Sequence, residues 1–203
     1  MGVVVRGKRR PVRPDSVHVL RGQDTRRRIL EAARTRILAA GFESLRLDDL
    51  ARDVGCTKAG IVKSVGGKAS ILLALGGQDR ESRLDLVRQA TKMRTGLRRR
   101  IGDVVARLYA LDLLRTNLVQ AYVGYLWFWT GADHEQAQGH LDDTLDILAD
   151  FMRSAAGPNE TTERIETLAL RMMAGYVIGL RDLHYSRSDI AQATRLVVDF
   201  VAD

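Results

Sequence analysis

The chain has 203 residues, of which 45% are hydrophobic and 28% are charged. This content is sufficient for a buried core and excludes a wholly disordered protein. The most apolar run, residues 118–129, is interrupted by Gln120 and is too short to span a bilayer, so we expect no membrane partner. The single cysteine, Cys56, excludes an intrachain disulfide framework and agrees with a reducing, cytoplasmic location.

The net charge of +7 is distributed unevenly along the chain. Residues 1–68 contain 16 Lys and Arg against 7 Asp and Glu, a balance of about +9, whereas the remainder contains 16 against 18, or about −2. This asymmetry favours a polyanionic partner for the N-terminal third. The alternative is a solvated basic face that only keeps the protein soluble.

The N-terminal third predicts a short arm followed by three helices. Residues 1–23 contain two of the three prolines, several basic residues and no apolar periodicity, and we interpret them as a flexible basic arm, either on DNA phosphates or without a role. Asp24 is the expected N-cap of a first helix, which ends at Gly41. A second helix is expected over about 45–54, and a third over residues 58–65.

The rest of the chain predicts helices only. A long apolar-periodic segment begins at Lys68, and the pair Gly76–Gly77 within it suggests a kink. Further helices are expected near 97–114, 117–130, 133–155, 160–184 and 188–202. The predicted fold is therefore all-α, with about nine helices. It divides into the arm, a three-helix head (24–68) and a helical body (69–203).

Several short motifs in the head match one known family in order and spacing. They are Ile29-Leu30-Glu31-Ala32-Ala33, Gly41-Phe42, Asp49-Leu50-Ala51 with Val54-Gly55, Thr57-Lys58, and Lys68 with Ile71-Leu72. This run, about a quarter of the chain, resembles the N-terminal domain of TetR-family transcriptional regulators. The resemblance implies a helix-turn-helix whose third helix enters the DNA major groove.

The resemblance also implies which residues contact double-stranded DNA. Thr57 and Lys68 are expected to position phosphates, since a hydroxyl and an ammonium at helix N-termini suit anionic oxygens. The family usually has a Tyr in the third helix followed by Tyr or His and then Phe, where this chain has Val62-Lys63-Ser64-Val65, and Arg46 replaces a small capping residue. The predicted DNA contacts are Arg46, Thr57, Lys58, Ala59, Gly60, Lys63, Ser64 and Lys68.

Aromatic and methionine side chains gather in the body. By resemblance the central helices enclose a pocket for a small-molecule effector, which apolar and aromatic walls would suit. These residues could equally fill a plain core. The predicted effector contacts are Tyr109, Tyr122, Tyr125, Trp127, Trp129, Met172 and Tyr176.

The last two predicted helices carry apolar stripes, and Gly175 and Gly179 would permit close helix approach. By resemblance these helices form a four-helix interface between two copies of the chain, although an intrachain core explains such stripes as well. The predicted homodimer contacts are Ile165, Leu168, Met172, Leu180, Val197, Phe200 and Val201.

No catalytic motif is evident, and His134 and His140 are six residues apart, a spacing that does not suit a metal site on one helix face. We therefore expect no enzyme, cofactor or metal. The predicted function is a DNA-binding regulator, typically a repressor, that a small molecule releases from a palindromic operator. The alternative is a helical ligand-binding or interaction protein whose helix-turn-helix no longer reads DNA.

Overall fold

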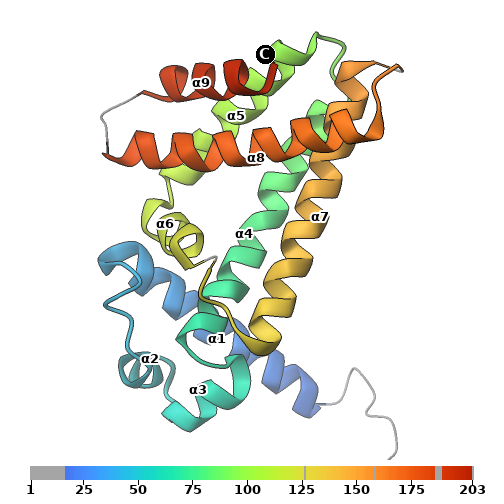
Figure 1. Ribbon diagram of the computed structural model, residues 1–203. Helices are drawn as coiled ribbons and strands as arrows, with labels where there is room; N and C mark the ends of the chain where they lie inside the picture. Colours follow the sequence, from blue (N-terminus) through green and yellow to red (C-terminus); the bar gives the residue numbers. More distant parts are fainter. Residues whose placement is uncertain (1–16, 126, 158, 186–188, 203) are drawn as a thin grey trace, which may run out of the picture.

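The computed structural model of the protein describes residues 17–125, 127–157, 159–185 and 189–202, and these residues form helices joined by turns, without strands (Figure 1). The helices are α1 (Val17–Ala40), α2 (Leu47–Val54), α3 (Lys58–Val65), α4 (Lys68–Ala90), α5 (Leu97–Leu113), α6 (Thr116–Tyr125), α7 (Gly131–Ala156), α8 (Thr162–Tyr185) and α9 (Ile190–Ala202). Over this part of the chain the all-α prediction is confirmed.

Local signals in the sequence determine the ends of the short head helices. Gly41 and Gly55 adopt φ of 78° and 70°, a left-handed conformation that favours glycine, and they follow α1 and α2. The Thr57 side chain accepts a hydrogen bond of 3.0 Å from the backbone N–H of Gly60 and so caps α3. The predicted bounds of α3 match the structure.

The first helix begins earlier than predicted. α1 starts at Val17, so Asp24 lies inside the helix and is not its N-cap. The Asp24 carboxylate instead accepts a hydrogen bond of 2.8 Å from Arg27, three residues further on. Residues 17–23 of the predicted arm are therefore helical, and residues 1–16 lie outside the described residues.

The core of the head continues into α4 and α6. Ile29 and Ile37 of α1 and Ile61 of α3 are fully buried in one cluster. The same cluster contains Ile71, Leu72 and Leu75 from α4 and Leu118 from α6. The helices α4 and α6 thus complete the hydrophobic core of the three-helix head.

The long helix α4 connects the head to the body, and its helical turns continue without a break through Gly76–Gly77, where the sequence suggests a kink. Both glycines instead permit close packing. A Cβ at Gly76 would lie 2.0 Å from the ring of Tyr122, and a Cβ at Gly77 would lie 2.9 Å from the imidazole of His140. The glycines therefore bring α6 and α7 against α4.

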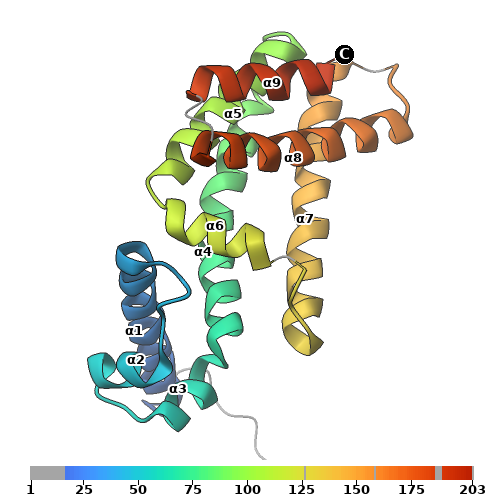
Figure 2. The same cartoon turned by 60° about the vertical axis from the view of Figure 1, so that its left-hand side comes forward.

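The helices α8 and α9 lie side by side at the end of the molecule opposite to the head (Figures 1 and 2). Five predicted dimer contacts are buried within this single chain, because α8 and α9 pack on α5 and α7; they are Ile165, Leu168, Met172, Val197 and Val201. Gly175 and Gly179 likewise approach Val197, Phe200 and Tyr109 of the same chain. These residues form an intrachain core, which corrects their assignment to an interface.

Candidate DNA-binding surface and effector cavity

Helix α3 presents its polar side to solvent at the end of the molecule away from α8 and α9 (Figure 2). The side chains of Thr57, Lys58, Ala59 and Lys63 are exposed, while Ile61 and Val65 anchor the helix in the head core. Four of the predicted DNA contacts are therefore accessible at α3. Gly60 and Ser64 are half-buried.

The cations of this surface differ in how strongly they are held by the protein. Lys58 forms an ion pair of 3.0 Å with Asp48 of α2. The Lys68 ammonium donates a 3.1 Å hydrogen bond to the backbone carbonyl of Glu43 and lies 4.5 Å from the centre of the Phe42 ring. Lys68 thus holds α4 against the α1–α2 loop. Lys63 and Arg46 form no ion pair within the described part of the chain and remain available to a polyanion.

The early start of α1 places further arginines beside α3. A guanidinium nitrogen of Arg26 donates a 2.9 Å hydrogen bond to the carbonyl of Ser64 at the end of α3. Arg21 and Arg26 line a surface hollow together with Gly60 and Lys63. Neither arginine was predicted to contact DNA. Arg21 was expected in the arm and Arg26 in the first helix, although the basic run up to Arg28 was a visible signal.

Two α1 arginines fix the position of α2. Arg28 donates a 2.8 Å hydrogen bond to the carbonyl of Val54 at the C-terminus of α2. Arg36 donates to both carboxylate oxygens of Asp53 and lies 3.9 Å from Asp49. The hydrogen bond from Arg36 lowers the pKa of Asp53 and opposes the effect of burial. These contacts orient α2, and through the tight Gly55 turn they orient α3.

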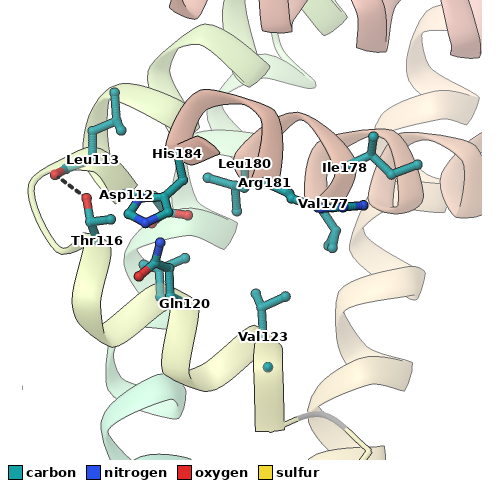
Figure 3. A pocket seen from close by; sticks show the side chains of 12 residues that line it. Asp112, Leu113, Thr116, Gln120, Val123, Val177, Ile178, Leu180, Arg181 and His184 are labelled. Carbon is teal, nitrogen blue, oxygen red and sulfur yellow. Dashed lines mark hydrogen bonds between the residues drawn. The ribbon is translucent and has the colours of Figure 1, made fainter. Parts of the chain in front are cut away.

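The body contains two adjacent cavities. The first, the α6–α8 cavity, has a volume of about 280 Å³ and lies between the end of α5, α6 and α8 (Figure 3). The second, the α4–α7 cavity, has a volume of about 190 Å³ and lies between α4, α6, α7 and α8. They share wall residues from α5, α6 and α8: Asp112, Val119, Val123, Val177 and Leu180.

A buried polar cluster lies at this shared wall. Asp112 is 3% exposed, and its carboxylate accepts hydrogen bonds from Arg83 Nε at 2.7 Å and from the Tyr176 hydroxyl at 2.5 Å. Burial and the adjacent Asp112 raise the pKa of Tyr176, so its hydroxyl remains a donor. Tyr176 stacks on Tyr109, with ring centres 4.7 Å apart, and the Tyr109 hydroxyl donates to the carbonyl of Tyr176.

The structure separates the predicted effector residues into different environments. Tyr122 and Tyr176 line the α4–α7 cavity. Tyr109 and Met172 are buried in the body core, whereas Tyr125 and Trp129 pack against each other at the head, with the Tyr125 ring 5.7 Å from that of Phe42. Trp127 is 89% exposed and lines neither cavity, which corrects its assignment, because the turn after α6 carries it to the surface.

Other cavity residues were not predicted from the sequence as ligand contacts. Leu180, predicted for the dimer, lines both cavities and is only half-buried. Arg80, Arg83, Asp112 and His140 were missed because charged residues on amphipathic helices are ordinarily solvent-facing. Asp112 follows the apolar Leu108 by four residues, a spacing that puts both on one face of a helix, and this was the available signal that Asp112 is buried.

Helix α6 lies between the cavities and the head. Val119 and Val123 face the cavities, whereas Leu118 is buried in the head core. The Asn117 side-chain amide donates a 2.9 Å hydrogen bond to the carbonyl of Leu38 in α1. A molecule that moves α6 would therefore act directly on the first helix of the head.

In the described ranges, no cluster of three or more His, Cys, Asp or Glu side chains could hold a metal ion. No single helix of that part is long and apolar enough to cross a membrane; the bent pair α3 and α4 meets the criteria of length and composition only.

The comparisons with known proteins concern the fold. No family model and no curated protein matches the sequence. The solved structures that are similar include FadR from Bacillus subtilis in complex with stearoyl-CoA (TM-score 0.67, 14% identity, covering 87% of this chain and 97% of that one). They also include a TetR-family regulator from Agrobacterium tumefaciens (0.64, 16%, 89% and 98%) and a protein from Saccharomonospora viridis in complex with choline (0.63, 22%, 89% and 96%). The chain has the fold of the TetR-family transcriptional regulators.

Proposed function

We propose that this protein is a homodimeric, sequence-specific DNA-binding regulator of the TetR type, which a small molecule releases from its operator. The observation that carries the proposal is the exposed face of α3, which Ile61 and Val65 anchor in the core. This face adjoins Lys63 and Arg46, two cations without an ion pair in the part of the chain that the structure describes. A helix presented in this way fits a major groove. The surrounding positive charge fits phosphates.

The cavities in the body support a ligand-dependent output. Two of the similar structures are complexes, one with stearoyl-CoA and one with choline, which supports a small-molecule ligand for this chain. A ligand shifts an equilibrium only if it binds one conformation more tightly than the other. In this chain α6 provides the connection, since Val119 lines a cavity wall while Leu118 completes the head core.

An exposed apolar surface supports the homodimer. Leu170 and Ile178 on α8 and Leu196 and Phe200 on α9 are each about half exposed or more. The guanidinium of Arg171 lies 5.9 Å from the centre of the Phe200 ring, so these surfaces of α8 and α9 adjoin. Among the interface residues predicted from the sequence, Phe200 is the one that lies on this exposed surface. Two copies joined here would place two α3 helices about 34 Å apart on a palindromic operator.

Binding to the DNA upstream of its own gene tests the proposal. We expect sequence-selective binding by fluorescence anisotropy, with an affinity that falls steeply as salt is raised. The variant Lys63→Ala is expected to reduce the slope of log affinity against log salt by about one. The matched control is Lys92→Ala, an exposed lysine in the α4–α5 turn of the body.

Two results would contradict the proposal. One is equal affinity for the upstream DNA and for a shuffled sequence at all salt concentrations. The other is no binding to either DNA while the body still binds small molecules. The second result would favour a helical ligand-binding protein whose helix-turn-helix does not read DNA.

A further inference from the structure

Positively charged side chains outnumber carboxylates among the residues that line the two body cavities. The lining residues include the arginines Arg80, Arg83 and Arg181, but Asp112 is the one carboxylate among them. Both oxygens of Asp112 are already engaged, one by Arg83 Nε and the other by the Tyr176 hydroxyl. The cavity walls therefore offer no uncommitted carboxylate. Since a buried ammonium requires an anionic partner, these walls disfavour a cationic ligand.

Donors in the α4–α7 cavity remain without acceptors. Arg83 uses its Nε atom for Asp112, and neither of its Nη atoms forms a hydrogen bond within the described ranges. The Tyr122 hydroxyl also has no hydrogen-bond partner there. Burial raises the pKa of Tyr122, and the positive charges of Arg80 and Arg83 oppose that rise, so the hydroxyl is a protonated donor close to both guanidinium groups.

The balance of charge at this position is positive. The Arg80 guanidinium forms ion pairs with Glu81 and Asp143, whose side chains are more than half exposed and therefore screened by water. Arg80 and Arg83 themselves are about one-fifth exposed. Arg80 is thus paired with carboxylates at the surface, whereas Arg83 is paired with the buried Asp112. A ligand carboxylate in the cavity would meet the positive charge of both guanidinium groups.

Most of the remaining wall is apolar. The residues that line both cavities include Val119, Val123, Val177 and Leu180. The α6–α8 cavity adds Leu113 and Ile178, together with the polar side chains of Thr116, Gln120, Arg181 and His184 (Figure 3). The two cavities, of about 280 and 190 Å³, adjoin each other along shared lining residues. Each lies somewhat below the lower limit of about 300 Å³ that is usual for ligand pockets, which favours a ligand of modest size, on the order of ten carbons.

We propose that the effector of this protein is an apolar monocarboxylic acid, with its carboxylate between Arg83 and Tyr122 in the α4–α7 cavity and its chain in the α6–α8 cavity. The inference rests on the proposed function in taking these cavities as the effector site. A guanidinium edge and a phenol hydroxyl are both suited to carboxylate oxygens, and charge-assisted hydrogen bonds of this kind are stronger than neutral ones.

Calorimetric titration of the purified full chain with decanoate, 1-decanol and decylamine tests the ligand class. Each compound is used at concentrations where it is dissolved as single molecules. We expect decanoate to bind with one site per chain, 1-decanol to bind about 10-fold to 100-fold more weakly, and decylamine not to bind. Octanoate and dodecanoate establish the preferred length. Equal affinity for the acid and the alcohol, or no binding of any of the three acids, would overturn the inference.

Two variants test the position of the carboxylate. Arg83→Lys keeps a positive charge beside Asp112 but removes the planar pair of Nη donors, and Tyr122→Phe removes only the hydroxyl. Each is expected to weaken decanoate binding about 10-fold and to leave 1-decanol binding unchanged. The matched control is Arg88→Lys, on the same helix but outside both cavities, which is expected to bind decanoate like the parent protein. Unchanged decanoate affinity in both cavity variants would contradict the proposed position.

These titrations contain no DNA, so the two proposals can fail separately. A protein that binds its upstream DNA but none of the acids retains the proposed function and loses this inference. A protein that binds decanoate through Arg83 but binds no DNA would support the ligand class and contradict the proposed regulatory function. Release of upstream DNA by decanoate, and not by 1-decanol at the same concentration, connects the two.

Discussion

Gly76 determines how closely α6 approaches α4, because a Cβ at this position would lie 2.0 Å from the Tyr122 ring. We expect Gly76→Ala to lower the free energy of unfolding by about 1 to 3 kcal/mol, the usual cost of overpacking. The control is Gly139→Ala, in the interior of α7 with no atom within 4 Å of the added Cβ, which is expected to raise stability by up to about 1 kcal/mol. Urea unfolding measures both, and equal effects of the two changes would contradict this account.

His140 is expected to make stability depend on pH. Burial, followed by the positive charge of Arg80, lowers its pKa below the ordinary value of 6.5. The unfolded chain then binds a proton more readily than the folded one, so the stabilising contribution is present above about pH 6.5 and is lost as pH falls below it. Denaturant unfolding between pH 7 and pH 5 should show a shallower loss for His140→Asn than for the parent protein. The exposed His134→Asn is the control and should keep the parent slope.

Single residues with a local role could be predicted from the sequence. Thr57 caps α3, and Gly55 ends α2 in the left-handed conformation, because capping and positive φ depend on only a few neighbouring residues. The partners of Lys68 could not be predicted. Its contacts with Glu43 and Phe42 depend on how α4 folds back on the α1–α2 loop.

Three elements meet at Asp79, a buried carboxylate of α4. It accepts hydrogen bonds from Arg34 of α1 at 2.8 and 2.9 Å, and Arg115, in the turn before α6, lies 2.8 Å from it. Asp79→Asn removes the negative charge that separates two arginines. We expect a loss of about 2 to 3 kcal/mol, less than for a fully buried pair, because both arginines are partly exposed.

The control for Asp79 lies on the same helix. Asp85 forms an exposed ion pair of 2.8 Å with Arg88, and exposed pairs contribute little. Asp85→Asn should therefore change the free energy of unfolding by less than about 1 kcal/mol. If the two substitutions have the same effect in chemical denaturation, Asp79 does not stabilise the junction of α1, α4 and α6.

The helices themselves were largely predictable, whereas their partners were not. An apolar stripe shows that a helix is buried on one side, but not against what, and so Ile165, Leu168 and Val197 were assigned to a second copy of the chain when they contact their own. The start of α1 was missed because residues 17–23 show no apolar period. A helical extension without apolar periodicity leaves little trace in the pattern.

The proposed dimer makes a prediction for the whole molecule. Leu196 is 53% exposed on α9 and lines neither body cavity, and replacing it with Glu would place a charge in the interface. We expect Leu196→Glu to be a monomer by light scattering, with an unchanged helical circular dichroism spectrum and weaker binding to a palindromic operator. The control is Leu114→Glu, a more exposed leucine before α6, which should remain dimeric. A parent protein that is already monomeric at micromolar concentration would contradict the interface.

The two body cavities are formed by side chains from several helices, which explains why sequence reasoning found only part of their lining. Tyr122 and Tyr176 were anticipated as aromatic residues, but Arg83 and Asp112 lie 29 residues apart on helices whose crossing brings them together. Trp127 looked equivalent to Trp129 in sequence and is exposed, while Trp129 is buried. Which side of a helix faces a cavity depends on every helix that surrounds it.

The participation of α6 in two cores has a consequence for how the protein unfolds. Leu118 completes the packing of α1, α3 and α4, and Val119 and Val123, on the same ten-residue helix, line the body cavities. The head therefore has no complete hydrophobic core without a helix that begins at residue 116. Head and body should melt in one calorimetric transition and exchange their core amides at a common rate, as a single cooperative unit. A fragment ending near residue 68 would lack that unit and should not fold alone.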